Sequence, residues 1–215
     1  MKVLDHNGKG YLSNLLYGLH WIHDNHIRLN IGLVNMSLGF SEGSPPLYSM
    51  IEKLHDLGII MVAAAGNKCP TSGGQEESGG DEGQGVCKDP QTTIMYPAAY
   101  SEVLSVAASD SKDKITYYSL EGKVGDIDIT ASGGARQNDK LILSTYLDGS
   151  YGFASGTSQS AALVTGILAL KLRQQPALSL DDVRTLLQHT ATPIDAAKRT
   201  QEGWGLIDAE SLLNK

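Results

Sequence analysis

The chain has 215 residues, 41% hydrophobic and 19% charged, and its 24 acidic against 17 basic side chains give a formal net charge of -7. This composition is typical of a globular chain with one sizeable core. No apolar run approaches the roughly 20 residues of a membrane span, no signal-peptide pattern opens the chain, and the basic residues are scattered rather than clustered. We therefore expect no membrane span, no signal peptide within these residues and no nucleic-acid partner.

Hydrophobic periodicity divides the chain into alternating helices and short apolar strands. Strands are expected at residues 2–4, 31–38, 58–65, 103–108, 127–130 and 142–146. Helices are expected at residues 12–28, 47–57, 158–173 and 179–189, with Ser13 and Ser179 as candidate N-caps. The nearly continuous apolar run at 31–38 predicts a strand buried on both faces. This alternation favours one α/β domain, with a parallel sheet that carries helices on its faces.

Residues 68–93 interrupt the alternation with glycines and acidic side chains, a composition typical of a surface loop inserted into the domain. Cys69 and Cys87 stand near its two ends. Their even number favours a disulfide and an extracellular setting, while the alternative is two unpaired thiols in a cytoplasmic protein. Four carboxylates of the loop invite a calcium hypothesis: Glu76, Glu77, Asp81 and Glu82. Their spacing does not match an EF-hand, so a solvated acidic loop is the favoured interpretation.

Three segments place small or polar side chains where a parallel sheet binds ligands. Ser158 in G-T-S opens the helix expected at 158–173, so its hydroxyl lies beside unpaired N–H groups that stabilise a developing oxyanion. The alternative for Ser158 is an ordinary N-cap serine. Asn67 ends the buried strand A-A-A-G-N, where its amide could donate to the same oxyanion, although asparagine is also common at turns. The strand end N-M-S-L-G places Gly39 where another backbone can lie close by.

Four segments, in this order, resemble the subtilisin-like serine proteases: N-M-S-L-G at 35–39, A-A-A-G-N at 63–67, Y-P-A-A-Y at 96–100 and G-T-S at 156–158. Each segment alone is weak, but the ordered set is specific and, with the K-V-L-D start, it covers nearly the whole chain. The resemblance implies a serine endopeptidase with a three-layer α/β fold around a mostly parallel sheet. It also implies that residues 1–215 are the C-terminal part of the catalytic domain, without its N-terminal strands.

The resemblance also assigns roles to individual residues. It implies that Ser158 is the nucleophile and that Asn67 donates to the oxyanion. The residues implied to bind an extended peptide or protein substrate as an added strand are Ser37, Leu38 and Gly39. Those implied to line the pocket for the side chain before the scissile bond are Ala64, Ala65 and Gly66, and Met95 hints at an apolar preference there. The Tyr96–Pro97 peptide bond is implied to be cis.

No cofactor is implied as required, but many members of the family bind a structural cation, for which calcium is the candidate here. The matching groups are the backbone carbonyls of Ala98, Tyr100 and Val103 and the carboxylate of Asp128. Hard cations take clustered oxygen ligands of this kind, so the same set is a candidate cation site in this chain.

Two motifs of the family are absent from residues 1–215. The family's D-T-G or D-S-G motif and its H-G-T-H motif lie before the segment with which this chain begins, and none of the six histidines has such a glycine-flanked setting. A serine hydroxyl needs a base and an orienting carboxylate to become a nucleophile. Three histidines, His20, His23 and His26, follow helical spacing and could hold a metal, although a solvated helix face is the commoner reason for this pattern.

In the family the aspartate strand lies centrally, between the strands that match residues 2–4 and 31–38, so its absence predicts unpaired strand edges. We therefore expect a chain that is inactive by itself and either poorly stable or completed by another polypeptide. Two alternatives are a non-catalytic peptide-binding remnant and one chain of a two-chain protease whose second polypeptide supplies both motifs. We expect the complete protein to be extracellular or periplasmic.

Overall fold

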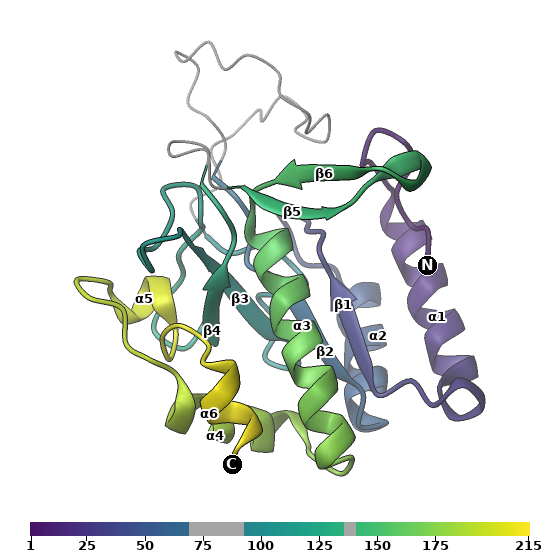
Figure 1. Ribbon diagram of the computed structural model, residues 1–215. Coiled ribbons are helices and arrows are strands. Elements are labelled where there is room, and N and C mark those ends of the chain that lie inside the picture. Colours follow the sequence, from purple (N-terminus) through teal and green to yellow (C-terminus); the bar gives the residue numbers. More distant parts are fainter. Residues whose placement is uncertain (69–92, 136–140) are drawn as a thin grey trace.

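The computed structural model describes residues 1–68, 93–135 and 141–215, which form a parallel sheet with helices on both faces (Figure 1). The strands are β1 (Leu33–Met36), β2 (Ile60–Ala64), β3 (Leu104–Ser109), β4 (Ile129–Ser132), β5 (Ile142–Thr145) and β6 (Tyr151–Ala154). The helices are α1 (Leu12–Leu29), α2 (Pro45–Asp56), α3 (Thr157–Gln174), α4 (Leu180–Thr190), α5 (Arg199–Glu202) and α6 (Ala209–Leu213). The α/β class expected from the sequence is confirmed, whereas β6 was not expected.

Four parallel strands lie in the order β1-β2-β3-β4, and β5 and β6 form a separate antiparallel hairpin. Because the four strands run in one direction, their carboxyl ends all lie along the same side of the sheet, which we call the carboxyl edge. The hairpin leads directly into α3, whose first turn lies at this same edge beneath β5 and β6 in Figure 1. The segments that follow β1 and β2 and the start of α3 are thereby brought together from three distant parts of the chain.

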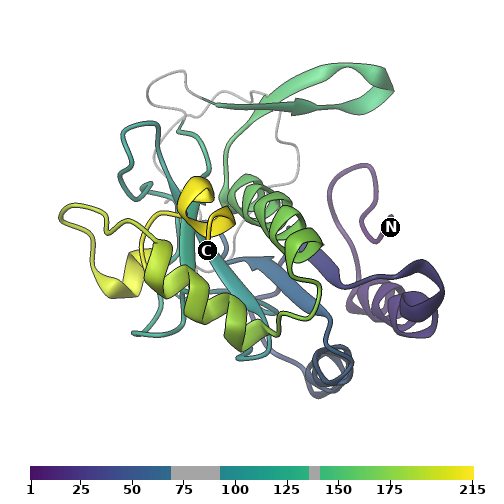
Figure 2. The same ribbon diagram turned by 60° about the horizontal axis from the view of Figure 1, so that its bottom comes forward.

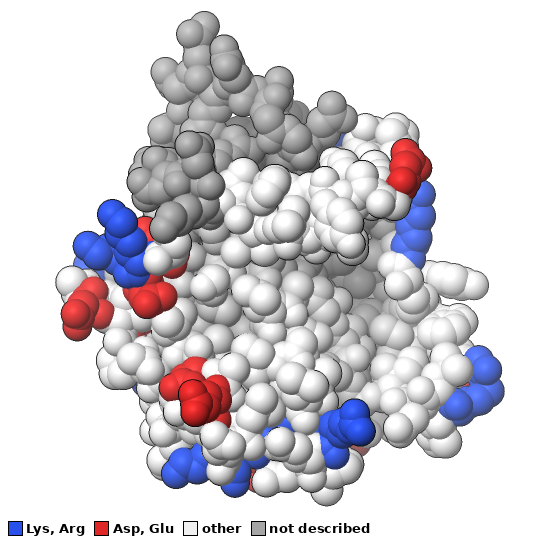
Figure 3. All heavy atoms as spheres, viewed as in Figure 1, with Lys and Arg blue, Asp and Glu red and all other residues white. Residues whose placement is uncertain are grey.

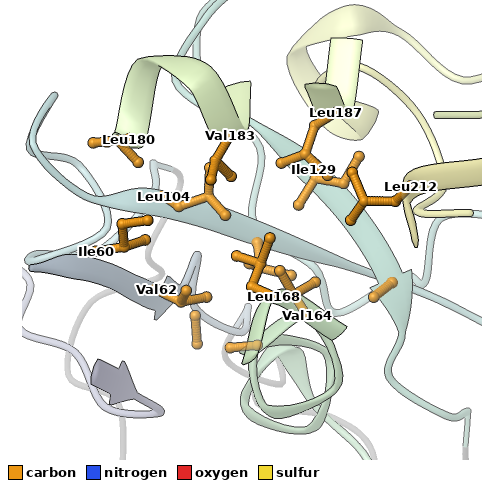
Figure 4. Close-up of a cluster of buried hydrophobic side chains, with 14 residues drawn as sticks. Ile60, Val62, Leu104, Ile129, Val164, Leu168, Leu180, Val183, Leu187 and Leu212 are labelled. Carbon is orange, nitrogen blue, oxygen red and sulfur yellow. The ribbon is translucent and has the colours of Figure 1, made fainter. Parts of the chain in front are cut away.

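Strand β2 shows how the three layers are built, because its side chains alternate between two cores. Ile60, Val62 and Ala64 pack with α3, α4 and α6 on one face, and Figure 4 shows Leu168 of α3 in this cluster. Met61 and Ala63 join the cluster formed with α1 and α2 on the other face. Figure 2 shows these helices on opposite sides of the sheet. Each fully buried aliphatic side chain contributes about 1.5–3 kcal/mol, so these two cores hold the layers together.

The helix ends show which capping expectations were right. Ser179 caps α4 as expected: its hydroxyl accepts the Asp182 N–H, while the Asp182 carboxylate accepts the Ser179 N–H at 2.9 Å. The hydrogen bonds from the Ser179 hydroxyl and N–H lower the pKa of Asp182 below its ordinary value. Ser13 does not cap α1, because the helix begins at Leu12 and Tyr11 occupies the N-cap position without a side-chain bond.

Two strand predictions near the N-terminus were wrong. Residues 2–4 form no strand, and the chain turns at Asp5, whose N–H donates to the Lys9 carbonyl at 2.7 Å. The strand expected at 31–38 is shortened to β1, and most of it is only half-buried or exposed. Both differences have one cause: β1 is the edge of the sheet, and among the described residues no strand pairs with its outer side. Residues 2–4 have no described strand to pair with, and β1 has a neighbouring strand on one side only, so its side chains are less enclosed than those of a central strand.

The loop predictions lie outside the described residues. The proposed Cys69–Cys87 disulfide and the acidic side chains of the insertion both fall within residues 69–92. The metal hypothesis for α1 gains no support, because within the described ranges no group of three or more His, Cys, Asp or Glu could hold a metal ion. Within the same ranges, no helix combines the length and the apolar composition needed to cross a bilayer.

Candidate active site

The candidate nucleophile lies in the first turn of α3, where the backbone conformation requires a glycine. Gly156 is the N-cap of α3 and has φ of 155°. A β-carbon built on it would lie 3.0 Å from Asn67 Nδ2, so any larger residue would press on that amide. Ser158 follows two residues later, and the helix dipole and free N–H groups of this first turn favour negative charge beside its hydroxyl.

Ser37 and Ser158 hold the end of β1 against the start of α3. The Ser37 hydroxyl donates to the Ser158 carbonyl at 2.8 Å, and the Ser158 hydroxyl makes a long 3.5 Å contact with the Ser37 carbonyl. No described histidine or carboxylate hydrogen-bonds to the Ser158 hydroxyl. The Ser158 hydroxyl therefore lies beside the end of β1, and no residue in the described ranges acts as a base toward it.

Asn67 is oriented by hydrogen bonds that leave its amide donor available. Its Oδ1 accepts hydrogen bonds from both the N–H and the hydroxyl of Thr157, each at 3.0 Å. The Thr157 hydroxyl in turn accepts the Gly66 N–H at 3.1 Å. Because a backbone N–H can only donate, the oxygen of the Asn67 amide must face Thr157, and Nδ2 must point the other way. The amide donor thus lies beside the first turn of α3, as an oxyanion donor requires.

The residues implied to bind substrate follow β1 and β2 at the same edge. Ser37, Leu38 and Gly39 directly follow β1, while Ala64 ends β2 and Gly66 lies two residues beyond it. Phe40 pairs with Tyr96 through hydrogen bonds of 2.8 and 2.9 Å in both directions, and the Tyr96–Pro97 bond is cis as expected. The structure brings these segments next to Ser158 and Asn67.

Tyr118 supports the turn before the nucleophile. Its hydroxyl donates to the Gly134 carbonyl at 2.6 Å, and the neighbouring Gly133 carbonyl accepts the Gly156 N–H at 2.9 Å. Burial raises the pKa of Tyr118 to about 12. The turn that carries Ser158 is therefore fixed from the sheet side by a neutral phenol.

The raised pKa of Tyr118 predicts that the protein loses stability at alkaline pH. The pKa of Tyr118 is about 10 unfolded and about 12 folded, so its contribution is complete below pH 10 and declines as the pH rises towards 12. We expect the free energy of unfolding, measured by urea titration, to fall across this range, and Tyr118→Phe to show a shallower fall. If the free energy of unfolding fell equally steeply with pH in both proteins, this role of Tyr118 would be contradicted.

Arg184 on α4 binds two of the four groups implied to hold a cation, the Asp128 carboxylate and the Val103 carbonyl. Its Nε donates to Asp128 Oδ1 at 2.8 Å, and its Nη2 donates to the Val103 carbonyl at 3.1 Å. The other carboxylate oxygen accepts the Ser105 N–H at 2.8 Å. A calcium ion among these ligands would lie beside the guanidinium charge, which opposes its binding. The residues fit an arginine–carboxylate pair better than a calcium site.

Breaking the ion pair between Arg184 and Asp128 should lower the stability of the protein, because the Asp128 side chain is only 8% exposed. We expect Arg184→Met to lower the free energy of unfolding by about 3 kcal/mol, since it leaves a buried carboxylate unpaired. Scanning calorimetry measures the loss. The double variant Arg184→Met, Asp128→Asn is the matched control, and it should recover most of the stability because the asparagine oxygen can still accept the Ser105 N–H. A full loss in the double variant would contradict the explanation.

The comparisons agree with this geometry. A family model described as the subtilase family matches residues 1–205. The chain therefore belongs to the subtilase family, a family of serine proteases. It is 33% identical over 211 residues to subtilisin DY of Bacillus licheniformis, covering 98% of this chain and 66% of that protein. It is 32% identical over 208 residues to the minor extracellular protease Epr of Bacillus subtilis (strain 168), covering 96% of this chain and 27% of that protein.

Solved structures show the same fold. The S41 psychrophilic protease superposes with a TM-score of 0.74 at 27% identity, covering 95% of this chain and 66% of that one. The prenylagaramide maturation protease PagA superposes with a TM-score of 0.70 at 21% identity, covering 98% and 69%, a likeness of fold alone. The chain thus spans 27% of the length of Epr and 66% of that of subtilisin DY.

Two interactions in and near the candidate site were not predicted from the sequence. Thr157 fixes the Asn67 amide, and Arg184 pairs with Asp128 across 56 residues of chain. Thr157 could have been considered, because it stands in the G-T-S segment beside the candidate nucleophile and its hydroxyl can bind a nearby polar group. Arg184 left no signal, since α4 has the ordinary pattern of an amphipathic surface helix.

Proposed function

We propose that this chain contributes the nucleophile and the oxyanion site of a serine endopeptidase. The observation that carries the proposal is the pairing of Asn67 with the first turn of α3: Thr157 holds the amide so that its donor lies beside Ser158. An asparagine that formed only a turn would not need its oxygen anchored by two donors from a segment 90 residues away. Membership of the subtilase family supports the same reading.

In the proposed reaction the Ser158 hydroxyl loses its proton to a base and attacks the carbonyl carbon of a peptide bond. Negative charge develops on the carbonyl oxygen, where Asn67 Nδ2 and the N–H groups of the first turn of α3 stabilise it. The tetrahedral intermediate collapses when the base returns the proton to the leaving amine, which leaves an acyl group on Ser158. Water then hydrolyses this acyl-enzyme by the same steps.

The substrate is proposed to be a peptide or protein bound as an extended strand. Ser37, Leu38 and Gly39 follow an edge strand, so their backbone groups are placed to pair with an added strand. We propose an extracellular or periplasmic setting for the complete protein, which the name of the relative Epr, an extracellular protease, supports.

The base is proposed to come from polypeptide outside residues 1–215, which we call the base-supplying segment. The outer side of β1 is unpaired within the described part of the chain, and a pocket of about 300 Å³ beside it is lined mainly by apolar residues of α1 and β1. The outward face of α3 exposes Leu163 (42%) and Leu170 (55%). Few charged side chains lie over α3 in Figure 3. An apolar helix face beside a free strand edge suits an added strand and its helix.

Hydrolysis assays test the proposal. Residues 1–215 alone should leave an unfolded protein substrate intact, and the same residues with the base-supplying segment, joined or co-expressed, should cleave it. The coding sequence before Met1 shows whether that segment precedes the chain, since an open frame with D-T-G and H-G-T-H motifs would supply it. Without such a frame, the absence of cleavage together with peptide binding would favour the second candidate, a non-catalytic peptide-binding remnant. This second candidate is supported by Ser37, Leu38 and Gly39, which could pair with a bound peptide even without catalysis.

A further inference from the structure

A short series of hydrogen bonds connects α3 with β1 beside the candidate nucleophile. The Thr165 hydroxyl lies 3.1 Å from Asn35 Oδ1, and Asn35 Nδ2 lies 2.9 Å from the Ser37 hydroxyl oxygen. The Ser37 hydroxyl in turn donates to the Ser158 carbonyl at 2.8 Å. Asn35 and Ser37 are two residues apart, so both side chains point to the face of β1 beside which α3 lies in Figure 1. Asn35 is therefore linked to the turn of the nucleophile through Ser37.

These hydrogen bonds determine the orientation of the Asn35 amide. A carbonyl can only accept, so the single proton of the Ser37 hydroxyl goes to the Ser158 carbonyl. The Ser37 oxygen must then accept from Asn35, which places Nδ2 toward Ser37 and Oδ1 toward Thr165. The amide nitrogen carries two hydrogens, and within the described part of the chain no acceptor takes the second one. Asn35 therefore has one donor to spare.

This spare donor lies at the open edge of the sheet. Asn35 belongs to β1, whose outer side pairs with no described strand, and its side chain is exposed. Asn35 also lines the pocket of about 300 Å³ beside β1. Every other described residue that lines this pocket is glycine, methionine, tryptophan or aliphatic. Polypeptide that fills the pocket would therefore bury the Asn35 amide, which needs an acceptor when it loses contact with water.

We propose that Asn35 is a positioning residue whose spare N–H donates to the carboxylate that orients the base in the base-supplying segment. The inference rests on the proposed function, in which that segment adds a strand to the outer side of β1. The backbone carbonyls of an added strand that face β1 are used in pairing with it, so a side chain must supply the acceptor. A carboxylate is the strongest acceptor that a side chain offers.

The position of Asn35 also fits the spacing of a catalytic triad. A histidine base must reach the Ser158 hydroxyl, which lies beside the Ser37 carbonyl. Its orienting carboxylate lies on the other side of the imidazole ring. Two residues of a strand span about 6.6 Å, which is close to the reach of an imidazole with a hydrogen bond at each nitrogen. Asn35, two residues before Ser37, thus lies where the carboxylate is expected.

Steady-state kinetics of the complete protein, residues 1–215 with the base-supplying segment, tests the inference. We expect Asn35→Ala to lower kcat about ten- to a hundredfold, as for a hydrogen bond to a charged group, and to leave KM nearly unchanged. Thr165→Val should lower kcat less, because the Thr165 hydroxyl also lies 2.7 Å from the Ala161 carbonyl and only partly holds Asn35. Asn214→Ala, at an exposed residue near the C-terminus, is the matched control and should change neither constant.

A pH profile distinguishes this role from a purely structural one. Asn35→Asp keeps the shape of the side chain but adds negative charge, which favours the protonated base. The acidic limb of kcat/KM should therefore move to higher pH by about one unit. No other side chain that lines the pocket is charged, so none of them offsets this effect. Melting temperatures show whether each variant is folded.

Two results would overturn the role of Asn35 and leave the proposed function standing. One is an unchanged kcat in Asn35→Ala, and the other is an unshifted acidic limb in a folded Asn35→Asp protein. Absence of cleavage by the unmodified complete protein would overturn the proposed function, and this inference with it.

Discussion

Replacing Ser158 with alanine should abolish peptide hydrolysis by the complete protein, lowering kcat/KM by at least about 10⁴-fold. The variant keeps the first turn of α3 and the oxyanion donors, but it has no atom that can form the acyl-enzyme. Because the Ser158 hydroxyl makes only a 3.5 Å contact with the Ser37 carbonyl, its removal should barely change the fold. The initial rate of cleavage of a chromogenic peptide, measured with equal protein concentrations, gives the ratio.

Ser13→Ala is the matched serine control, because Ser13 is an exposed residue of α1, and it should leave the rate unchanged. The melting temperatures of Ser158→Ala and of the unmodified protein should agree within a few degrees. Residual hydrolysis above one tenth of the original rate, in a folded Ser158→Ala protein, would rule out Ser158 as the nucleophile.

Replacing Asn67 with alanine should lower kcat by about 10²- to 10³-fold, or about 2.7–4 kcal/mol, the loss reported for removal of an oxyanion asparagine in a subtilisin. The KM should change little, because the Asn67 amide acts on charge that develops only in the transition state. Steady-state kinetics with one peptide substrate separates the two constants. A loss confined to KM would show that Asn67 binds substrate rather than the oxyanion.

Thr157→Val is the matched variant for this prediction. It removes the hydroxyl that binds Asn67 Oδ1 but keeps the Thr157 N–H bond to the same oxygen. One anchoring bond is lost and the donor remains, so we expect a fall in kcat of about tenfold or less, as for one ordinary hydrogen bond. If Thr157→Val were as harmful as Asn67→Ala, the hydroxyl would have a more direct part in the reaction.

Local patterns predicted much of this molecule. Hydrophobic periodicity predicted the helix that begins beside Ser158. A continuous apolar run predicted the buried strand that ends before Asn67. The G-T-S and A-A-A-G-N segments then identified Ser158 and Asn67, the two residues most important to the proposed chemistry. Their meeting at one sheet edge followed from the parallel arrangement alone.

Features that depend on neighbours distant in the sequence could not be predicted in the same way. The apolar run of β1 was expected to be buried on both faces, and only the order of strands shows it to be an edge. The segment of Met95 and Tyr96 bonds to Ala65 after β2 and to Phe40 after β1, and its own residues do not predict these distant partners. The pair of Arg184 and Asp128 is likewise set by the packing of α4 on the sheet.

The most direct test of the account is labelling by a fluorophosphonate probe, with the modified residue identified by mass spectrometry of the digested protein. We expect rapid labelling of Ser158 when the base-supplying segment is present and slow labelling of residues 1–215 alone. The probe reports activation of the serine hydroxyl and does not depend on substrate preference. Rapid labelling of residues 1–215 alone would contradict the claim that the base lies outside them, and labelling elsewhere than Ser158 in the complete protein would contradict the nucleophile itself.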